Sequence, residues 1–238
     1  MRVLVACEES QAVCTAFRKL GHEAYSADLQ ECSGGHPEWH IMGDVLPLIN
    51  GNCEFDTVDG SHHAIDGKWD LLIAHPPCTY LTNVATRHYS LKCTPAEKVI
   101  ERMKKREEAI VFFMQMALAD CPRIAVENPI GRMNAVYRKA DQVIHPYMFS
   151  GGCSDTEQFV TKATCLWLKG LPKLQATYNG GKPNNAEIFG IYKNGKPRTW
   201  EEVRRGGKDR AKIRSKTFPG IAQAMAEQWG GVRNACRL

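Results

Sequence analysis

Short apolar runs alternate with helical stretches along the first half of the chain, and this alternation constrains the fold more than any other feature. Each run is short enough for a buried strand, and the runs span residues 2–6, 23–28, 40–45, 69–74 and 123–128. Strands that alternate with helices predict a largely parallel sheet whose two faces are both covered. The sequence therefore predicts an α/β fold.

Two helical segments carry clear end signals. The apolar residues from about residue 10 to residue 20 lie on one helical face, and Gly21 follows them as a C′ glycine. A longer segment, 94–121, has Thr94 as its predicted N-cap and Pro95 at its first helical position. Its apolar residues also share a face, and we expect the mixed-charge face opposite them to be solvated.

Polar and reactive side chains follow the ends of the predicted strands. Ligands of parallel α/β sheets bind beyond the carboxyl ends of the strands, so we expect these side chains to gather at one binding edge. The ends of four of these strands carry Cys7, Glu8, Glu9 and Ser10, then Asp28, then Pro76, Pro77 and Cys78, and last Glu127, Asn128 and Pro129.

Cys78 stands out among the ten cysteines because it belongs to this group. Most cysteines are buried and fill space, but a thiolate near neutral pH is a strong nucleophile. Glu127 ends an apolar strand, so it needs a partner if buried, and it could offer a proton or a hydrogen bond to a heterocycle. An acid about twenty residues after the first turn, here Asp28, is the usual partner of a ribose. Together they indicate attack on an electron-poor ring, followed by group transfer.

The other cysteines and histidines show no metal-site pattern. The cysteines are scattered, without a C-x-x-C pair or zinc-type spacing, which favours free thiols in a reduced, cytoplasmic protein without a metal. We expect His75 and His88 to be structural or loop residues, and His62 and His63 to form a polar turn. No apolar run has the roughly 20 residues that span a bilayer, and the N-terminus lacks a signal-peptide pattern, so no membrane partner is expected.

Charge is distributed unevenly along the chain, although the net charge is only +5. Residues 1–168 carry 16 Lys/Arg against 21 Asp/Glu, whereas residues 169–238 carry 15 against 5. A basic C-terminal region favours a polyanionic partner, nucleic acid first, and a solvated lysine-rich surface is the alternative. The residues that we expect to contact phosphates are Arg204, Arg205, Lys208, Arg210 and Arg214.

The order of these motifs resembles that of the DNA cytosine-5 methyltransferases, above all the short, prophage-type members. "PPC" (76–78) and "ENP" (127–129) resemble the Pro-Cys and Glu-Asn-Val motifs of that family. "QFVTK" (158–162) resembles its Gln-x-Arg-x-Arg motif, and "SKTFPGIAQAMAEQW" (215–229) resembles its closing segment and helix. The segment order agrees over nearly the whole chain.

The resemblance implies a class I S-adenosylmethionine-dependent methyltransferase fold, with a Rossmann-like sheet and a reduced target-recognition region. Residues 1–170 and 211–238 would form the catalytic domain, and 171–210 would form a small basic recognition insert. The implied cofactor is S-adenosyl-L-methionine and the implied partner is DNA. Because the insert is small, a partner protein is a further candidate for target recognition.

The resemblance also implies roles for single residues. Cys78 would add to carbon 6 of cytosine, Glu127 would engage the ring nitrogen and exocyclic amine, and Lys162 would face the ring oxygen. Carbon 5 would then take the methyl group. In the cofactor site, Asp28 would bind the ribose and Asp44 the adenine amino group, and the other lining residues would be Ala6, Cys7, Glu8, Ser10 and Pro76.

The chain departs from the family pattern at several positions. Cys7 and Glu9 stand where the family has glycines in the first turn, Val5 replaces an aromatic residue, and Lys162 replaces an arginine. Two alternatives therefore stay open. One is an enzyme that modifies carbon 5 of a pyrimidine in single-stranded DNA, RNA or a nucleotide, and the other is a catalytically silent DNA-binding relative.

Overall fold

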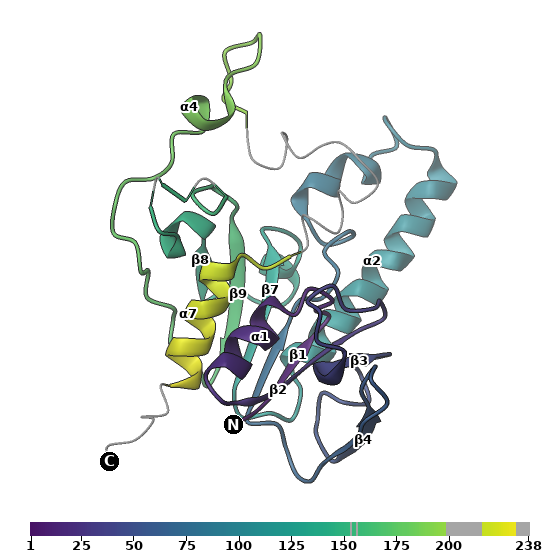
Figure 1. Cartoon of the computed structure of the whole chain (residues 1–238). Helices are drawn as coiled ribbons and strands as arrows, with labels where there is room; N and C mark the ends of the chain where they lie inside the picture. Colours follow the sequence, from purple (N-terminus) through teal and green to yellow (C-terminus); the bar gives the residue numbers. More distant parts are fainter. Residues whose placement is uncertain (153, 156, 199–215, 232–238) are drawn as a thin grey trace.

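A seven-stranded sheet with the order β3-β2-β1-β6-β7-β9-β8 forms the centre of the protein. The computed structural model describes residues 1–152, 154–155, 157–198 and 216–231 (Figure 1). Strands β3, β2, β1, β6 and β7 are parallel, and β9 runs antiparallel to both β7 and β8. The strands of this sheet are β1 (Arg2–Ala6), β2 (Glu23–Asp28), β3 (His40–Met42), β6 (Leu71–Ala74), β7 (Ile124–Pro129), β8 (Gln142–Ile144) and β9 (Thr164–Lys169), and a separate hairpin joins β4 (Cys53–Asp56) to β5 (His62–Ile65).

Helices cover both faces of the sheet because successive side chains of a strand point to opposite faces. In β1, Leu4 and Ala6 pack in a core with α2, whereas Val3 and Val5 pack in a second core with α1 and α7. Figure 1 shows α1 and α7 side by side, with α2 apart from them. This arrangement confirms the predicted α/β fold. The helices are α1 (Ala12–Lys19), α2 (Ala96–Ala117), α3 (Met133–Val136), α4 (Asn185–Phe189) and α7 (Pro219–Gly230), with short 3-10 helices η1 (Pro37–Trp39), η2 (Asn83–Tyr89) and η3 (Pro146–Phe149).

The hairpin of β4 and β5 differs from the sequence-based expectation. The prediction that His62 and His63 form a polar turn is wrong, because the chain reverses before it reaches them. Gly60 has φ +86°, and the Asp59 carboxylate accepts hydrogen bonds from the backbone and hydroxyl of Ser61 at 3.2 and 2.8 Å. The turn is therefore complete by Ser61, and both histidines belong to the returning strand.

The helix ends confirm one predicted signal and correct another. Gly21 follows α1 with φ +77° and donates its backbone N–H to the Arg18 carbonyl at 2.9 Å, as a C′ glycine does. The prediction that Thr94 caps the second helix is wrong, because Pro95 occupies the N-cap position and α2 begins at Ala96. The ψ of Pro95 is 145°, an extended conformation that places the proline outside the helix.

Between β9 and α7 the chain is described as far as residue 198 and again from residue 216, so the predicted insert 171–210 is described in part. In this stretch α4 begins after Asn184, whose side chain accepts a hydrogen bond from the backbone of Ala186 at 3.1 Å. The cysteines within the described ranges are thiols that form no disulfide with one another, which agrees with the prediction of thiols over a disulfide framework. Within the same ranges, no helix combines the length and the hydrophobicity needed to cross a bilayer.

Candidate active site

The strand-end side chains gather at one edge because the parallel strands are in register. Ala6 at the end of β1 pairs with Ala27 of β2 and with Ala74 of β6, and Ala74 pairs with Val126 of β7. The residues that follow these positions (Cys7, Asp28, His75 and Glu127) therefore lie at the same level of the sheet, Asp28 and Glu127 still within their strands. This edge has two halves, the turn after β1 with the ends of β2 and β3, and the ends of β6 and β7.

The turn after β1 adopts a glycine-like backbone without glycine. Cys7 has φ 60° and Gln11 has φ 56°, and this left-handed region costs most residues about 1–2 kcal/mol. The buried Gln11 side chain stabilises the turn by donating to the His36 carbonyl at 2.7 Å and accepting from the His36 N–H at 3.1 Å. The β2–β3 loop thus closes over the turn, and Cys7 adopts a left-handed conformation that glycine reaches most easily.

The Glu8 carboxylate is engaged by α1. Its two oxygens accept hydrogen bonds from the backbone N–H groups of Val13 at 2.7 Å and Cys14 at 3.1 Å, which satisfies donors that the first helical turn leaves unpaired. Burial raises the pKa of the Glu8 carboxyl, although the nearby His75 and these two hydrogen bonds act in the opposite direction. Glu8 was predicted to bind the cofactor, and the structure engages its carboxylate with α1 and its backbone N–H with the Ala27 carbonyl at 3.2 Å.

Cys7, Asp28 and Asp44 lie close enough to interact electrostatically. Burial, then the charge of Asp28, then that of Asp44, raise the pKa of the Cys7 thiol to about 12. Cys7 is therefore a neutral thiol at physiological pH and not a nucleophile. Asp28 accepts a hydrogen bond from the backbone of Gln30 at 2.9 Å, and Asp44 accepts one from Leu46 at 3.0 Å. These three residues, all predicted to bind a cofactor, thus form one group. Two further residues carry the same prediction. Ala6 is buried at the end of β1, and the Ser10 hydroxyl accepts a hydrogen bond from the backbone N–H of Ala12 at 3.5 Å.

Leu29 and Met42 are site residues that sequence reasoning missed. Leu29 follows Asp28 directly and is 78% exposed, and Met42 pairs with Asp28 across β2 and β3 and is 56% exposed. Two exposed apolar side chains beside two carboxylates can accommodate a flat heteroaromatic ring with polar substituents. The sequence signal was that each apolar residue lies near a predicted acid, because Leu29 follows Asp28 and Met42 lies two residues before Asp44.

The Pro-Pro-Cys step presents the Cys78 thiol at the surface. Pro76 is buried, whereas Cys78 is exposed, and the Cys78 carbonyl accepts hydrogen bonds from the backbone of Leu81 and Thr82, both at 3.0 Å. The buried Asn128 donates from its side chain to the Pro76 carbonyl at 2.7 Å. The residue next to Glu127 therefore holds the segment that carries Cys78.

The loops after Cys78 and after β7 are paired with each other. Thr82 forms a β-bridge with Gly131, and the Arg132 N–H donates to the Leu81 carbonyl at 2.7 Å. Gly131 has no room for a side chain, because a Cβ atom would collide with the Leu81 carbonyl oxygen. This close approach connects the Cys78 loop to the strand end that carries Glu127.

Two arginines of α2 anchor the Cys78 loop, so the expectation that the mixed-charge face of this helix is only solvated is wrong for them. The Arg102 guanidinium lies 4.9 Å from the Tyr80 ring centre and 5.3 Å from that of Tyr89, and it donates to the Thr79 carbonyl at 3.2 Å. Arg106 lies 4.3 Å from the Tyr89 ring centre. The long apolar stems and flat heads of arginine suit such aromatic contacts.

Glu127 has the partner that its burial requires, and that partner is His75. The Glu127 Oε2 atom lies 3.2 Å from His75 Nδ1, and the two side chains are 22% and 7% exposed. Lys162 interacts electrostatically with both, and its Nζ lies 5.6 Å from the Phe218 ring centre. The structure thus brings Glu127 and Lys162 together and adds His75, which was expected to be structural. The sequence signal was a histidine directly after the neighbouring strand.

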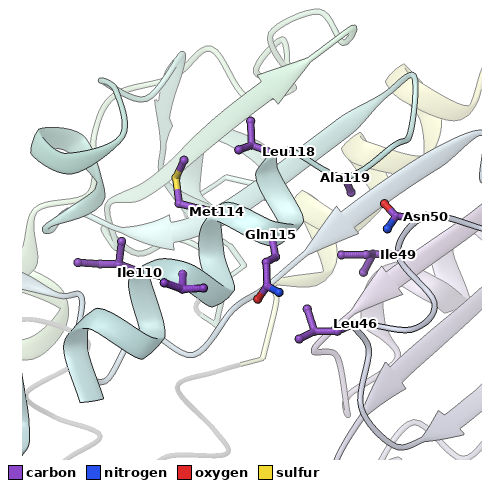
Figure 2. Close-up of a pocket in the computed structure, with 9 residues that line it drawn as sticks. Leu46, Ile49, Asn50, Ile110, Met114, Gln115, Leu118 and Ala119 are labelled. Atoms are coloured by element: carbon purple, nitrogen blue, oxygen red, sulfur yellow. The ribbon is translucent and has the colours of Figure 1, made fainter. Parts of the chain in front are cut away.

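Other predicted or possible sites lie elsewhere. The basic candidates at 204, 205, 208, 210 and 214 fall outside the described residues. A cavity of about 450 Å³ between α2 and the segment around Leu46 and Ile49 is lined by apolar and amide side chains, and it shares no residue with the strand-end site (Figure 2). Among the described residues no cluster of three metal-binding side chains occurs.

Comparison with other proteins does not assign this site. No protein-family model matches the chain, and no curated protein matches it.

We predict that Gly131→Ala destabilises the protein by about 1–3 kcal/mol, the usual range for overpacking a tight site. Chemical denaturation would measure the change, and Gly181→Ala is the control because a Cβ there has no neighbour within 4 Å. Equal stability of both variants would show that the two loops do not approach as closely as described.

Proposed function

We propose that this protein transfers a methyl group from S-adenosylmethionine to carbon 5 of cytosine in DNA through a covalent Cys78 adduct. The observation that carries the proposal is the exposed Cys78 thiol, which stands two residues after Pro76, whose carbonyl is hydrogen-bonded to Asn128, the neighbour of Glu127 in the Glu127–His75 pair. The largely parallel seven-stranded sheet is also compatible with the Rossmann-like fold that the motif resemblance implies.

The ends of β1, β2 and β3 fit an adenosine-type cofactor. Asp28 can accept hydrogen bonds from ribose hydroxyls and Asp44 from the adenine amino group, while Leu29 and Met42 offer apolar surface for the ring. Cys7 has a left-handed backbone, the conformation that a glycine at this position would adopt. S-Adenosylmethionine would supply the methyl group.

The residues at β6 and β7 account for the chemistry on cytosine. The target base is taken out of the stack, at an unstacking cost of a few kcal/mol by rough estimate. The Cys78 sulfur bonds to carbon 6, and the electrons of the 5,6 double bond make carbon 5 nucleophilic. Glu127 engages the ring nitrogen and exocyclic amine, and Lys162 lies near enough to stabilise the ring oxygen. After methylation, loss of the carbon 5 proton and of the thiolate restores the double bond.

We expect Cys78→Ser to abolish methyl transfer without loss of folding or cofactor binding. The hydroxyl is a far weaker nucleophile than the thiolate, so the covalent step fails. The test is incubation with labelled S-adenosylmethionine and DNA, followed by identification of the modified nucleoside. Cys93→Ser, at another exposed cysteine, is the matched control and should keep full activity. A serine variant at position 78 with substantial activity would eliminate the covalent mechanism.

We expect Asp28→Ala to weaken S-adenosylmethionine binding by about 1.5–3 kcal/mol, the range for hydrogen bonds to a charged group. Isothermal titration calorimetry measures this without requiring activity, and Asp66→Ala, at an exposed acid on another loop, serves as the control. Unchanged affinity would mean that Asp28 is only a turn residue. No binding by the wild-type protein would favour the catalytically silent DNA-binding alternative.

The basic C-terminal region distinguishes a DNA enzyme from one acting on free nucleotides. We expect DNA binding that weakens with salt, with a log–log slope of about −3 to −6 if roughly four to six phosphates are neutralised. Replacing Arg204, Arg205, Lys208 and Arg210 with alanine should flatten the slope and weaken all sequences about equally. Modification of a free nucleotide as fast as DNA, without salt-sensitive DNA binding, would favour the nucleotide alternative.

A further inference from the structure

His75 is held beside Glu127 by the strand register. Ala74 of β6 pairs with Val126 of β7, so His75 and Glu127, the next residues of the two segments, lie at the same level, with Glu127 still paired with Leu166 of β9. The His75 backbone N–H donates to the Ala6 carbonyl of β1 at 2.9 Å, which continues the ladder on the β1 side. The backbone of His75 is therefore held by β1, and its Nδ1 lies 3.2 Å from Glu127 Oε2.

The charged groups that face His75 are mostly negative. Glu127 reaches it from β7 and Glu8 from the turn after β1, whereas Lys162, from the segment before β9, is the opposing cation. Burial acts to lower the pKa of His75, but the Glu127 hydrogen bond and the charges of Glu127 and Glu8 outweigh it and the pKa is raised. Burial also acts to raise the pKa of Glu127, but His75 and Lys162 outweigh it and that pKa is lowered.

Both shifts favour the same resting state, in which His75 carries the proton and Glu127 is ionised. Only one side of the imidazole is hydrogen-bonded, however. Among the described residues His75 Nε2 is buried without a hydrogen-bond partner. A ring bonded to carboxylates at both nitrogens would keep its proton more firmly than this one does. The proton on Nδ1 is thus stored but can be transferred.

Cytosine bound at Glu127 would create a need for this proton. The ring nitrogen at position 3 of neutral cytosine is an acceptor, and an ionised carboxylate also only accepts, so the two repel each other without a proton between them. Addition of sulfur to carbon 6 would increase the electron density at this nitrogen. A proton transferred to this nitrogen as its electron density rises would stabilise the adduct.

We propose that His75 is the proton store of the proposed reaction, the residue that supplies Glu127 with the proton it passes to the pyrimidine ring nitrogen. As the Cys78–carbon 6 bond forms, one proton moves from His75 Nδ1 to Glu127 and one from Glu127 to the ring nitrogen. Both return when the thiolate leaves, so the relay consumes no proton. This role rests on the proposed function, and His75 acts through Glu127 as a positioning residue.

The kinetic test compares pH–rate profiles of the wild-type protein and His75→Asn, whose amide can still donate to Glu127. We expect wild-type kcat to fall as pH rises through the raised pKa of His75, because the stored proton is then lost. The asparagine variant should lose about 100-fold or more in kcat at neutral pH with little change in KM, and the loss should shrink at low pH as solvent protonates Glu127. His63→Asn, in the β4–β5 hairpin, is the matched control and should keep the wild-type profile.

A second variant keeps the proposal testable if His75→Asn does not fold. Glu8→Gln retains an acceptor for α1 but removes a charge that favours the imidazolium, so the fall in kcat should move to lower pH. Nitrogen-15 NMR of the histidine rings in the full wild-type chain measures the charge state directly. We expect both ring nitrogens of His75 to be protonated at pH 7, and the ring to lose its proton at lower pH in Glu127→Gln.

The outcomes separate the two proposals. Methylation by the wild-type protein together with an unchanged pH profile in His75→Asn, or a neutral His75 ring at pH 7, overturns the role of His75 alone. A wild-type protein that methylates no nucleic acid overturns the proposed function, and the proton role with it. Methylation, a charged ring and the shifted profiles together support the proton store.

Discussion

Burial of the parallel sheet on both faces is the constraint on which the rest of the structure depends. β1, β6 and β7 lie between two helical layers, so their interior positions accept only apolar side chains. Polar groups therefore gather at the carboxyl ends of these strands, and parallel strands in register have these ends at one edge. The condition that stabilises the core therefore also concentrates carboxylates, an imidazole and a thiol at the candidate site.

Charges gathered at this edge have a desolvation cost that local contacts offset. An ionised group that loses water without gaining a partner is destabilised by roughly several kcal/mol. The Glu8 carboxylate is hydrogen-bonded to two amides of α1, and Glu127 is bonded to His75 with Lys162 nearby. Because each protonation state depends on the neighbouring charges, a change at one group shifts the proton among the others. Such coupling suits a reaction in which a proton must follow electrons into and out of a ring.

The elements that could be predicted follow local rules. Apolar runs predicted the five parallel strands that line the site, which are β1, β2, β3, β6 and β7. A glycine after an amphipathic segment predicted the end of α1. The wrong predictions concern a turn and a helix start, where the local sequence is compatible with more than one backbone conformation. A turn at Asp59–Gly60 sends His62 and His63 into a strand, and the extended ψ of Pro95 moves the start of α2 to Ala96. Neither choice is visible in hydrophobic periodicity.

The sequence by itself determined that Asp28, Cys78 and Glu127 belong to the carboxyl ends of buried strands, because Asp28 and Glu127 end apolar runs and Cys78 follows another run by four residues. Only the tertiary structure decided what these residues meet. It paired Glu127 with His75, and it used two arginines of α2 to hold the loop that follows Cys78. These contacts join segments that are distant in the chain. They depend on strand register and on the close approach of loops, and a pattern read along the sequence contains neither.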